Sequence, residues 1–138
     1  MRQPTPNSVR NFSSDGKFLA CSGLIEASNP LGAVSNPAVV VLDWAEGKEK
    51  TLLRPKEDVK GVAWGVRFHP DGFLIAVSGG TSGGVLWFFH PEGPNETFRH
   101  NLPNTGRALD LSLDGSLLAT AHHDGHLRLW TLATGPAA

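Results

Sequence analysis

The 138-residue sequence lacks several features that mark particular classes of protein. It has one cysteine, Cys21, so no disulfide can form within the chain, and the apolar residues around it predict a buried, inert thiol. The longest apolar runs, AVVVL and VLWFF, are five residues long, far too short to span a membrane. The N-terminal MRQPTPNSVRNFSSDG has no apolar core of a secretory signal. We therefore expect a cytoplasmic location and no membrane partner.

The sequence also lacks an excess of charge of either sign. Twelve basic and thirteen acidic residues give a formal net charge of −1, and no run of basic residues occurs. This balance gives no electrostatic indication of nucleic-acid binding. The composition, 40% hydrophobic and 18% charged, is typical of a globular domain with a real core.

Helical periodicity is absent from every window of the sequence. Short apolar runs alternate instead with turn-forming residues, and the chain contains 16 glycines and 10 prolines. Many short strands joined by turns are the expected result, so the fold class is all-β.

Three segments of the sequence resemble one another: VRNFSSDGKFLACSG (9–23), VRFHPDGFLIAVSGG (66–80) and LDLSLDGSLLATAHH (109–123). Each is an alternating run, then Asp-Gly, then a second apolar run. Asp and Gly accept the positive φ angles that tight hairpin turns require, so each segment predicts a β-hairpin.

A further β-rich run and a glycine follow each hairpin, and the glycines at 47, 93 and 135 are 46 and 42 residues apart. This period, with several strands per repeat, is typical of propeller blades. The chain provides eleven expected strands: SVRNF, KFLACS, AVVVLDW, EKTLLR (49–54), AWGVRFH, FLIAVS, VLWFF, ETFRHNL, ALDLSL, LLATAH and LRLWTL.

The stretches LSLDGSLLATAHHDGHLRLW and VRFHPDGFLIAVSGG resemble repeats of the WD40 β-propeller family, and the resemblance covers essentially the whole chain. It implies a partial β-propeller of about three four-stranded antiparallel blades, in a single region 1–138 with repeats at roughly 8–48, 49–94 and 95–138. Closed propellers have about four to eight blades, so we expect an open arc. The arc is a fragment of a larger propeller, or closes by self-association, or the chain adopts another small β-structure.

The resemblance also implies a buried hydrogen-bond network in the third blade, formed by His100, Thr120, Asp124 and Trp130. Phe88 and Leu42 occupy the tryptophan position in the other two repeats, which lack most of the set. We expect those blades to depend on apolar packing. On this interpretation Asp124→Ala destabilises the fold and His122→Ala does not.

The HHDGH stretch, 122–126, has two chemical alternatives to a plain hairpin turn. Its histidines and Asp124 could bind a metal, but only two histidines flank the turn and no Cys or Glu accompanies them. A His–Asp–Ser catalytic set has no G-x-S-x-G context, and GGTSGG (79–84) leads into a strand, unlike a phosphate-binding loop. We expect no catalytic residue, metal or cofactor.

One feature exceeds the plain repeat pattern. The first two Asp-Gly pairs are 56 residues apart and the next two 43, which places an insertion, GLIEASNPLGAVSN, at 23–36. The resemblance places this insertion, GGTSGG and HHDGH on one face, where the family usually binds partners. The candidate residues on this face are Leu24, Ile25, Glu26, Leu31, Thr81, Ser82, His122 and His126.

These observations predict a non-catalytic scaffold for protein–protein interaction. Its partners would be proteins, together with the rest of the propeller or a second copy. The alternative is that the arc is the C-terminal propeller of a multidomain enzyme or signalling protein, for example one linked to a kinase.

Overall fold

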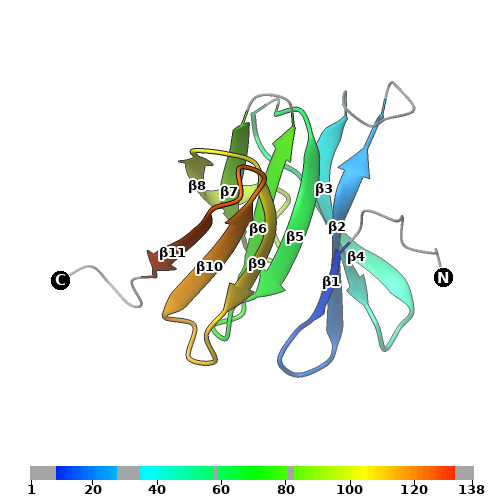
Figure 1. Ribbon diagram of the computed structural model, residues 1–138. Helices are drawn as coiled ribbons and strands as arrows, with labels where there is room; N and C mark the ends of the chain where they lie inside the picture. The colour runs from blue at the N-terminus through cyan, green and yellow to red at the C-terminus, as the bar shows by residue number, and fades with distance from the viewer. Residues whose placement is uncertain (1–8, 28–34, 58, 81–82, 133–138) are drawn as a thin grey trace.

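The computed structural model describes residues 9–27, 35–57, 59–80 and 83–132, which form eleven strands in three antiparallel sheets (Figure 1). The strands are β1 (Val9–Phe12), β2 (Phe18–Ile25), β3 (Asn36–Asp43), β4 (Lys48–Leu53), β5 (Val62–Phe68), β6 (Leu74–Gly80), β7 (Gly83–Phe89), β8 (Glu96–Leu102), β9 (Gly106–Leu111), β10 (Leu117–His122) and β11 (Leu127–Thr131). The described part of the chain contains no apolar helix long enough to cross a membrane.

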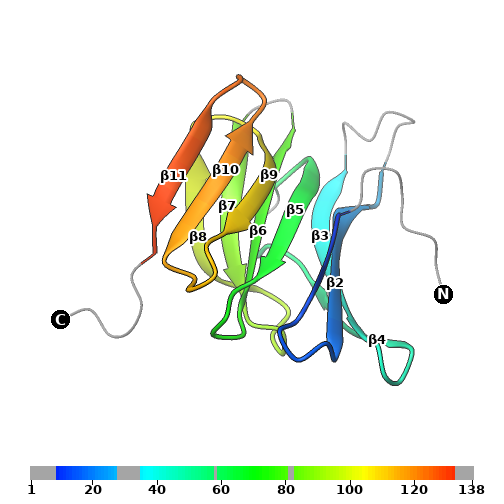
Figure 2. The same ribbon diagram turned by 60° about the horizontal axis from the view of Figure 1, so that its bottom comes forward.

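The three sheets are consecutive blades of an open array (Figures 1 and 2). The first has strand order β1-β2-β3-β4, the second β5-β6-β7-β8 and the third β9-β10-β11. The inner strands β1, β5 and β9 lie side by side, and the blades fan outward from them. This arrangement confirms the predicted all-β fold and the partial propeller, with three strands in the described part of the last blade.

The Asp-Gly pairs form the predicted turns between the first two strands of each blade. Gly16, Gly72 and Gly115 have φ angles of 73°, 98° and 74°, which glycine adopts without strain. Asp114 accepts hydrogen bonds from the hydroxyls of Ser112 and Ser116 and from the Ser116 backbone N–H. These bonds lower the pKa of the Asp114 carboxyl to about 2.

The core consists of two layers, one between each pair of neighbouring blades. The first layer is formed by Ala20, Val39, Val41, Leu53, Val66, Leu74, Ala76, Val85, Trp87 and Phe89. The second is formed by Ile75, Val77, Leu86, Leu102, Leu109 and Leu118. Strand β6 contributes alternate residues to both layers, which explains its uninterrupted apolar sequence.

The outer face of the third blade is apolar and exposed. Leu127 and Leu129 on β11 are 78% and 75% exposed, and Leu117 on β10 is 47% exposed. The register pairs Ala119 with Leu129 and Ala121 with Leu127, so small and large apolar side chains share this face. The corresponding face of the second blade is covered by the third blade. The uncovered face of the third blade is therefore what an array of blades shows when it has not closed into a ring.

Side-chain hydrogen bonds connect neighbouring blades. The Phe68 backbone N–H donates to Asn11 Oδ1 at 2.7 Å, which connects the first two blades. The buried His69 ring connects the second and third, with Nε2 2.9 Å from the carbonyl oxygen of Gly115. Nδ1 of the same ring accepts the Asp71 N–H, so Nε2 carries the proton and donates.

A matched pair of glycine substitutions tests the His69 contact. We expect Gly16→Ala to cost about 1–2 kcal/mol in unfolding free energy, because of its positive φ alone, since open space surrounds it. Gly115 has nearly the same φ, but a Cβ there would overlap the His69 ring, so Gly115→Ala should cost about 1–3 kcal/mol more. Denaturant titration of both variants measures the difference, and equal losses would show that the contact is not made.

Candidate functional site

A continuous hydrogen-bond chain runs through the third blade. Trp130 Nε1 donates to Thr120 Oγ1 at 2.8 Å, and Thr120 Oγ1 lies 2.7 Å from His122 Nε2. His122 Nδ1 lies 3.1 Å from the carbonyl oxygen of Asn104. That carbonyl can only accept, so Nδ1 carries the proton and Nε2 accepts the Thr120 hydroxyl. A neutral His122 therefore satisfies every member of the chain.

The structure corrects the composition of the predicted network. Thr120 and Trp130 hold the expected positions, but the histidine that joins them is His122 rather than His100. His100 is exposed on β8 and contacts the Trp130 ring edge-to-face at 5.3 Å between centroids. His122 is only 6% exposed, so the expectation that it lies on the partner-binding surface is wrong. Successive residues of a strand point to opposite faces of the sheet, so Leu118, Thr120 and His122 share one face. This spacing of two residues could have identified His122 from the sequence.

Asp124 lies outside this network and acts at the turn between β10 and β11. Its carboxylate pairs with the Arg128 guanidinium at 2.9 Å and accepts the His126 backbone N–H at 3.1 Å. The Arg128 hydrogen bonds hold the pKa of the Asp124 carboxyl well below its usual range. Asn104 Oδ1 accepts the Asp124 N–H at 3.0 Å, so this residue of the β8–β9 loop connects the turn to the network. Asn104 carried no signal in the sequence.

At the positions that correspond to Trp130 and Thr120, the first two blades carry less polar side chains. The strand pairing identifies the equivalent positions in the three blades. Phe88 lies opposite Ile75 and Leu42 opposite Leu19, just as Trp130 lies opposite Leu118 in the third blade. Apolar or weakly polar side chains, Val77 and the half-buried Cys21, replace Thr120. The layer between these two blades is an apolar core that includes Val41, Trp87 and Phe89.

The loop face is the end of the array at which β2, β6 and β10 end and β3, β5, β7, β9 and β11 begin. Leu24 and Ile25 are half-buried in β2, where they pair with Pro37 and Asn36. Part of the predicted insertion thus extends the first hairpin. Glu26, beyond the end of β2, is exposed and bonds to Asn36 and Arg54. Leu31, Thr81 and Ser82 lie outside the described residues.

The histidines of the β10–β11 turn have different environments. His123 and His126 are exposed, and His126 Nδ1 lies 3.3 Å from Asp124 Oδ1. His122 points inward, with both ring nitrogens engaged by Thr120 and Asn104. Within the described ranges, no three His, Cys, Asp or Glu side chains gather as metal ligands.

Two further residues on the loop face form a contact between blades. The Arg107 guanidinium stacks over the Trp64 ring, with Cζ 4.5 Å from the ring centroid. Trp64 lies on β5 and Arg107 on β9. Neither residue is among the candidates predicted from the sequence, because their contact depends on how the blades stack.

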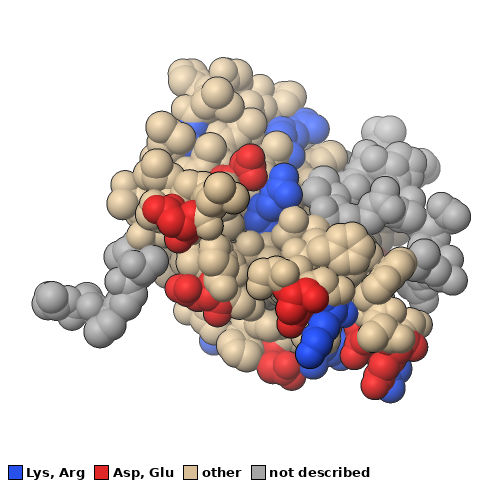
Figure 3. All heavy atoms as spheres, turned by 90° about the horizontal axis from the view of Figure 1, so that it is seen from below, with Lys and Arg blue, Asp and Glu red and all other residues tan. Residues whose placement is uncertain are grey.

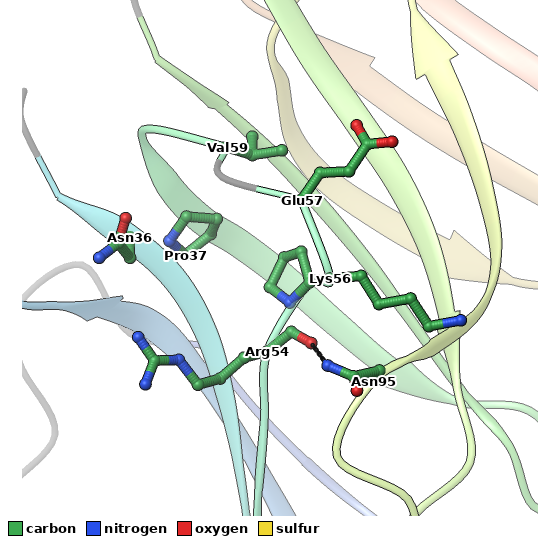
Figure 4. A pocket seen from close by; sticks show the side chains of 8 residues that line it. Asn36, Pro37, Arg54, Lys56, Glu57, Val59 and Asn95 are labelled. Atoms are coloured by element: carbon green, nitrogen blue, oxygen red, sulfur yellow. Dashed lines mark hydrogen bonds between the residues drawn. The ribbon is translucent and has the colours of Figure 1, made fainter.

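A hollow of about 440 Å³ separates the segment after β4 from the second blade (Figure 4). Asn95 Nδ2 donates to the Arg54 carbonyl at 3.0 Å across it. Glu57 pairs with Arg99. The described residues that line it include no Ser, Cys or His; they are Asn36, Pro37, Arg54, Pro55, Lys56, Glu57, Val59 and Asn95.

The opposite end of the array carries acidic and basic side chains side by side (Figure 3). Lys48 pairs with Glu46 at 2.8 Å and Lys50 with Glu92 at 3.0 Å. Exposed pairs of this kind contribute little to stability. Their mixed charge gives this end no single electrostatic character.

Comparisons with known proteins agree with this architecture. Residues 97–131, which run from β8 to the end of β11, match the family model for the WD domain, G-beta repeat. Over 115 residues the chain is 27% identical to a WD40 repeat-containing protein of Dictyostelium discoideum. The alignment covers 78% of this chain and 16% of that relative, so the chain spans about a sixth of the relative's length.

The hydrogen-bond chain predicts which turn histidine is structural. We expect His122→Ala to lower the free energy of unfolding by about 1–3 kcal/mol, because it leaves the buried Thr120 hydroxyl and the Asn104 carbonyl without partners. His126→Ala, the matched control in the same turn, should change it by less than about 0.5 kcal/mol. Denaturant unfolding measures both, and a larger loss for the His126 variant would contradict the network.

Proposed function

Because this chain carries a WD40 repeat within an open array of propeller blades, we propose that it is a non-catalytic scaffold that binds protein partners through its loop face. WD40 domains generally mediate protein–protein interactions. The observation that carries the proposal is the stacked pair of Trp64 and Arg107 on this face, because Trp and Arg are enriched among residues that dominate interface energies.

The geometry of the blades supports a role as a platform. Side chains of the loop face are held by contacts to the sheets, as the Trp64 ring is by the hydrogen bond from Nε1 to the Gly79 carbonyl at 3.1 Å. Side chains held in this way lose little conformational entropy when a partner binds. The balanced charge of the chain favours proteins over nucleic acids or membranes as partners, and the cytoplasm is the location we propose.

We propose as well that further blades cover the exposed face of the third blade. Leu117, Leu127 and Leu129 form an apolar patch there, and such surfaces are usually covered by a partner. The occupant we favour is the remainder of a longer propeller, with a second copy as the alternative. The relative's much greater length is compatible with this proposal.

The length of the relative is also compatible with a second function, in which this chain is the propeller of a multidomain enzyme or signalling protein. In that case the platform would position substrates or regulators for a catalytic domain elsewhere in the chain. The sequence that flanks this region in the full-length transcript distinguishes the two, since a kinase or protease domain there would favour the multidomain enzyme.

Two double variants test the loop face as the binding surface. We expect Ala27→Glu with His126→Glu to reduce retention of partner proteins on the immobilised chain, because both introduce charge on exposed positions of the loop face. The matched control, Ser14→Glu with Leu113→Glu, adds the same charge to turns at the opposite end. This control should retain the partner proteins as the parent chain does. Quantitative mass spectrometry of the retained proteins compares the variants. Equal loss with both, or loss only with the control, would contradict the proposal.

Charged substitutions in the apolar patch test whether this patch is covered by further blades or by a second copy. We expect Leu127→Lys with Leu129→Lys to increase the monomeric fraction of the isolated chain, because lysines cannot be buried without partners. Light scattering gives the mass distribution, and lysines at Ser14 and His126 are the control for added charge. Heavy aggregation of the parent chain indicates absent blades, whereas a monodisperse dimer indicates self-closure. A monodisperse parent monomer, unchanged by either variant, would contradict the proposal.

A further inference from the structure

Arg107 differs from the other arginines whose side chains the structure describes. Those four have a carboxylate within ion-pair distance; they are Arg54, Arg67, Arg99 and Arg128. Arg107 is exposed at the second position of β9, and its polar contact within the described residues is with His123 Nδ1 at 3.2 Å. A guanidinium has five N–H donors, so most of those on Arg107 face outward without an acceptor from the described part of the chain.

The Trp64 indole fixes one face of this guanidinium. Trp64 is the extra residue of a β-bulge, since Ala63 pairs with Ser78 and Gly65 with Val77. Such a bulge redirects a side chain out of the regular alternation, and bulges are common beside functional sites. Trp64 Nε1 donates to the Gly79 carbonyl at 3.1 Å, which holds the ring in place beneath Arg107.

His123 fixes one edge of the guanidinium. Its Nδ1 accepts from Arg107, so the ring presents Nδ1 without a proton, and the His123 backbone N–H donates to the Thr105 carbonyl at 3.0 Å. The three side chains come from β5, β9 and the β10–β11 turn, and therefore from two blades. Figure 1 shows β5 and β9 next to each other beneath that turn. The arrangement exists only when the second and third blades are stacked.

We propose that Arg107, held by Trp64 and His123, binds a carboxylate of an acidic segment in the partner protein. The proposal rests on the proposed function and names the chemistry of its partner. A planar guanidinium with free N–H groups matches the two oxygens of a carboxylate. A single fixed positive charge suits a monoanion, whereas recognition of a phosphate group generally uses a cluster of arginines.

A peptide titration followed by NMR tests this chemistry on the full chain. The probe is the acetylated, amidated peptide GEGEGE, and its control is GQGQGQ of the same length. We expect the acidic peptide at low salt to shift the Trp64 indole N–H and the Arg107 Nε–H signals, and the neutral peptide to leave them unchanged. Added salt should weaken binding, because the contact is between exposed charges.

Substitutions of Arg107 test whether peptide binding requires its guanidinium group or only a positive charge. We expect Arg107→Gln to weaken binding of the acidic peptide by about tenfold or more, the loss typical of one charge-assisted hydrogen bond. Arg107→Lys should not restore it, because lysine lacks the planar fork and stacks less well. Arg54→Gln removes an ion-paired arginine near the same end and should leave binding within about twofold. Backbone amide spectra of each variant show whether the fold is retained.

Three results would overturn the assignment. These are unchanged binding by the Arg107→Gln variant, equal binding of the neutral peptide, and at least about tenfold tighter binding of the same peptide with phosphoserine in place of glutamate. The last result would assign the site to phosphate. If Arg107→Gln has no effect on peptide binding but the loop-face double variant still loses the retained proteins, the scaffold function stands and this inference fails.

Discussion

The packing of one blade face against the next is the constraint on which the structure depends. Strand β6 shows it most clearly, with Leu74 and Ala76 in the layer toward the first blade and Ile75 and Val77 in the layer toward the third. Burial of aliphatic side chains on both faces supplies most of the favourable free energy. The hairpins alone could not provide it, because an isolated hairpin is at best marginally stable in water.

This constraint also explains why the blades differ. The second blade is covered on both faces and needs no internal polar network, so Phe88 and Val77 suffice where the third blade has Trp130 and Thr120. The third blade is covered on one face, and its hydrogen-bond chain from Trp130 to Asn104 joins β11, β10 and the β8–β9 loop. Every member of that chain is satisfied, which is the condition under which a buried polar network stabilises a fold.

The loop face depends on the same packing for its chemistry. Trp64 and Arg107 belong to different blades, and their contact exists because β5 and β9 lie side by side. A surface assembled from neighbouring blades can vary residue by residue without changing the sheets beneath it. Function on this scaffold therefore lies in particular side chains, while the fold supplies their positions.

The sequence by itself determined the strands, the Asp-Gly turns and the repeat, because alternation and turn chemistry are local properties that each segment carries. It also placed Thr120 and Trp130 correctly, since their strands are the most regular. Only the tertiary structure decided that His122 turns inward while His100 stays exposed, and that Glu26 bonds to Arg54. Those outcomes, and the stacking of Arg107 over Trp64, depend on which segments meet between blades, and residues far apart in a sequence carry no local signal of such contacts.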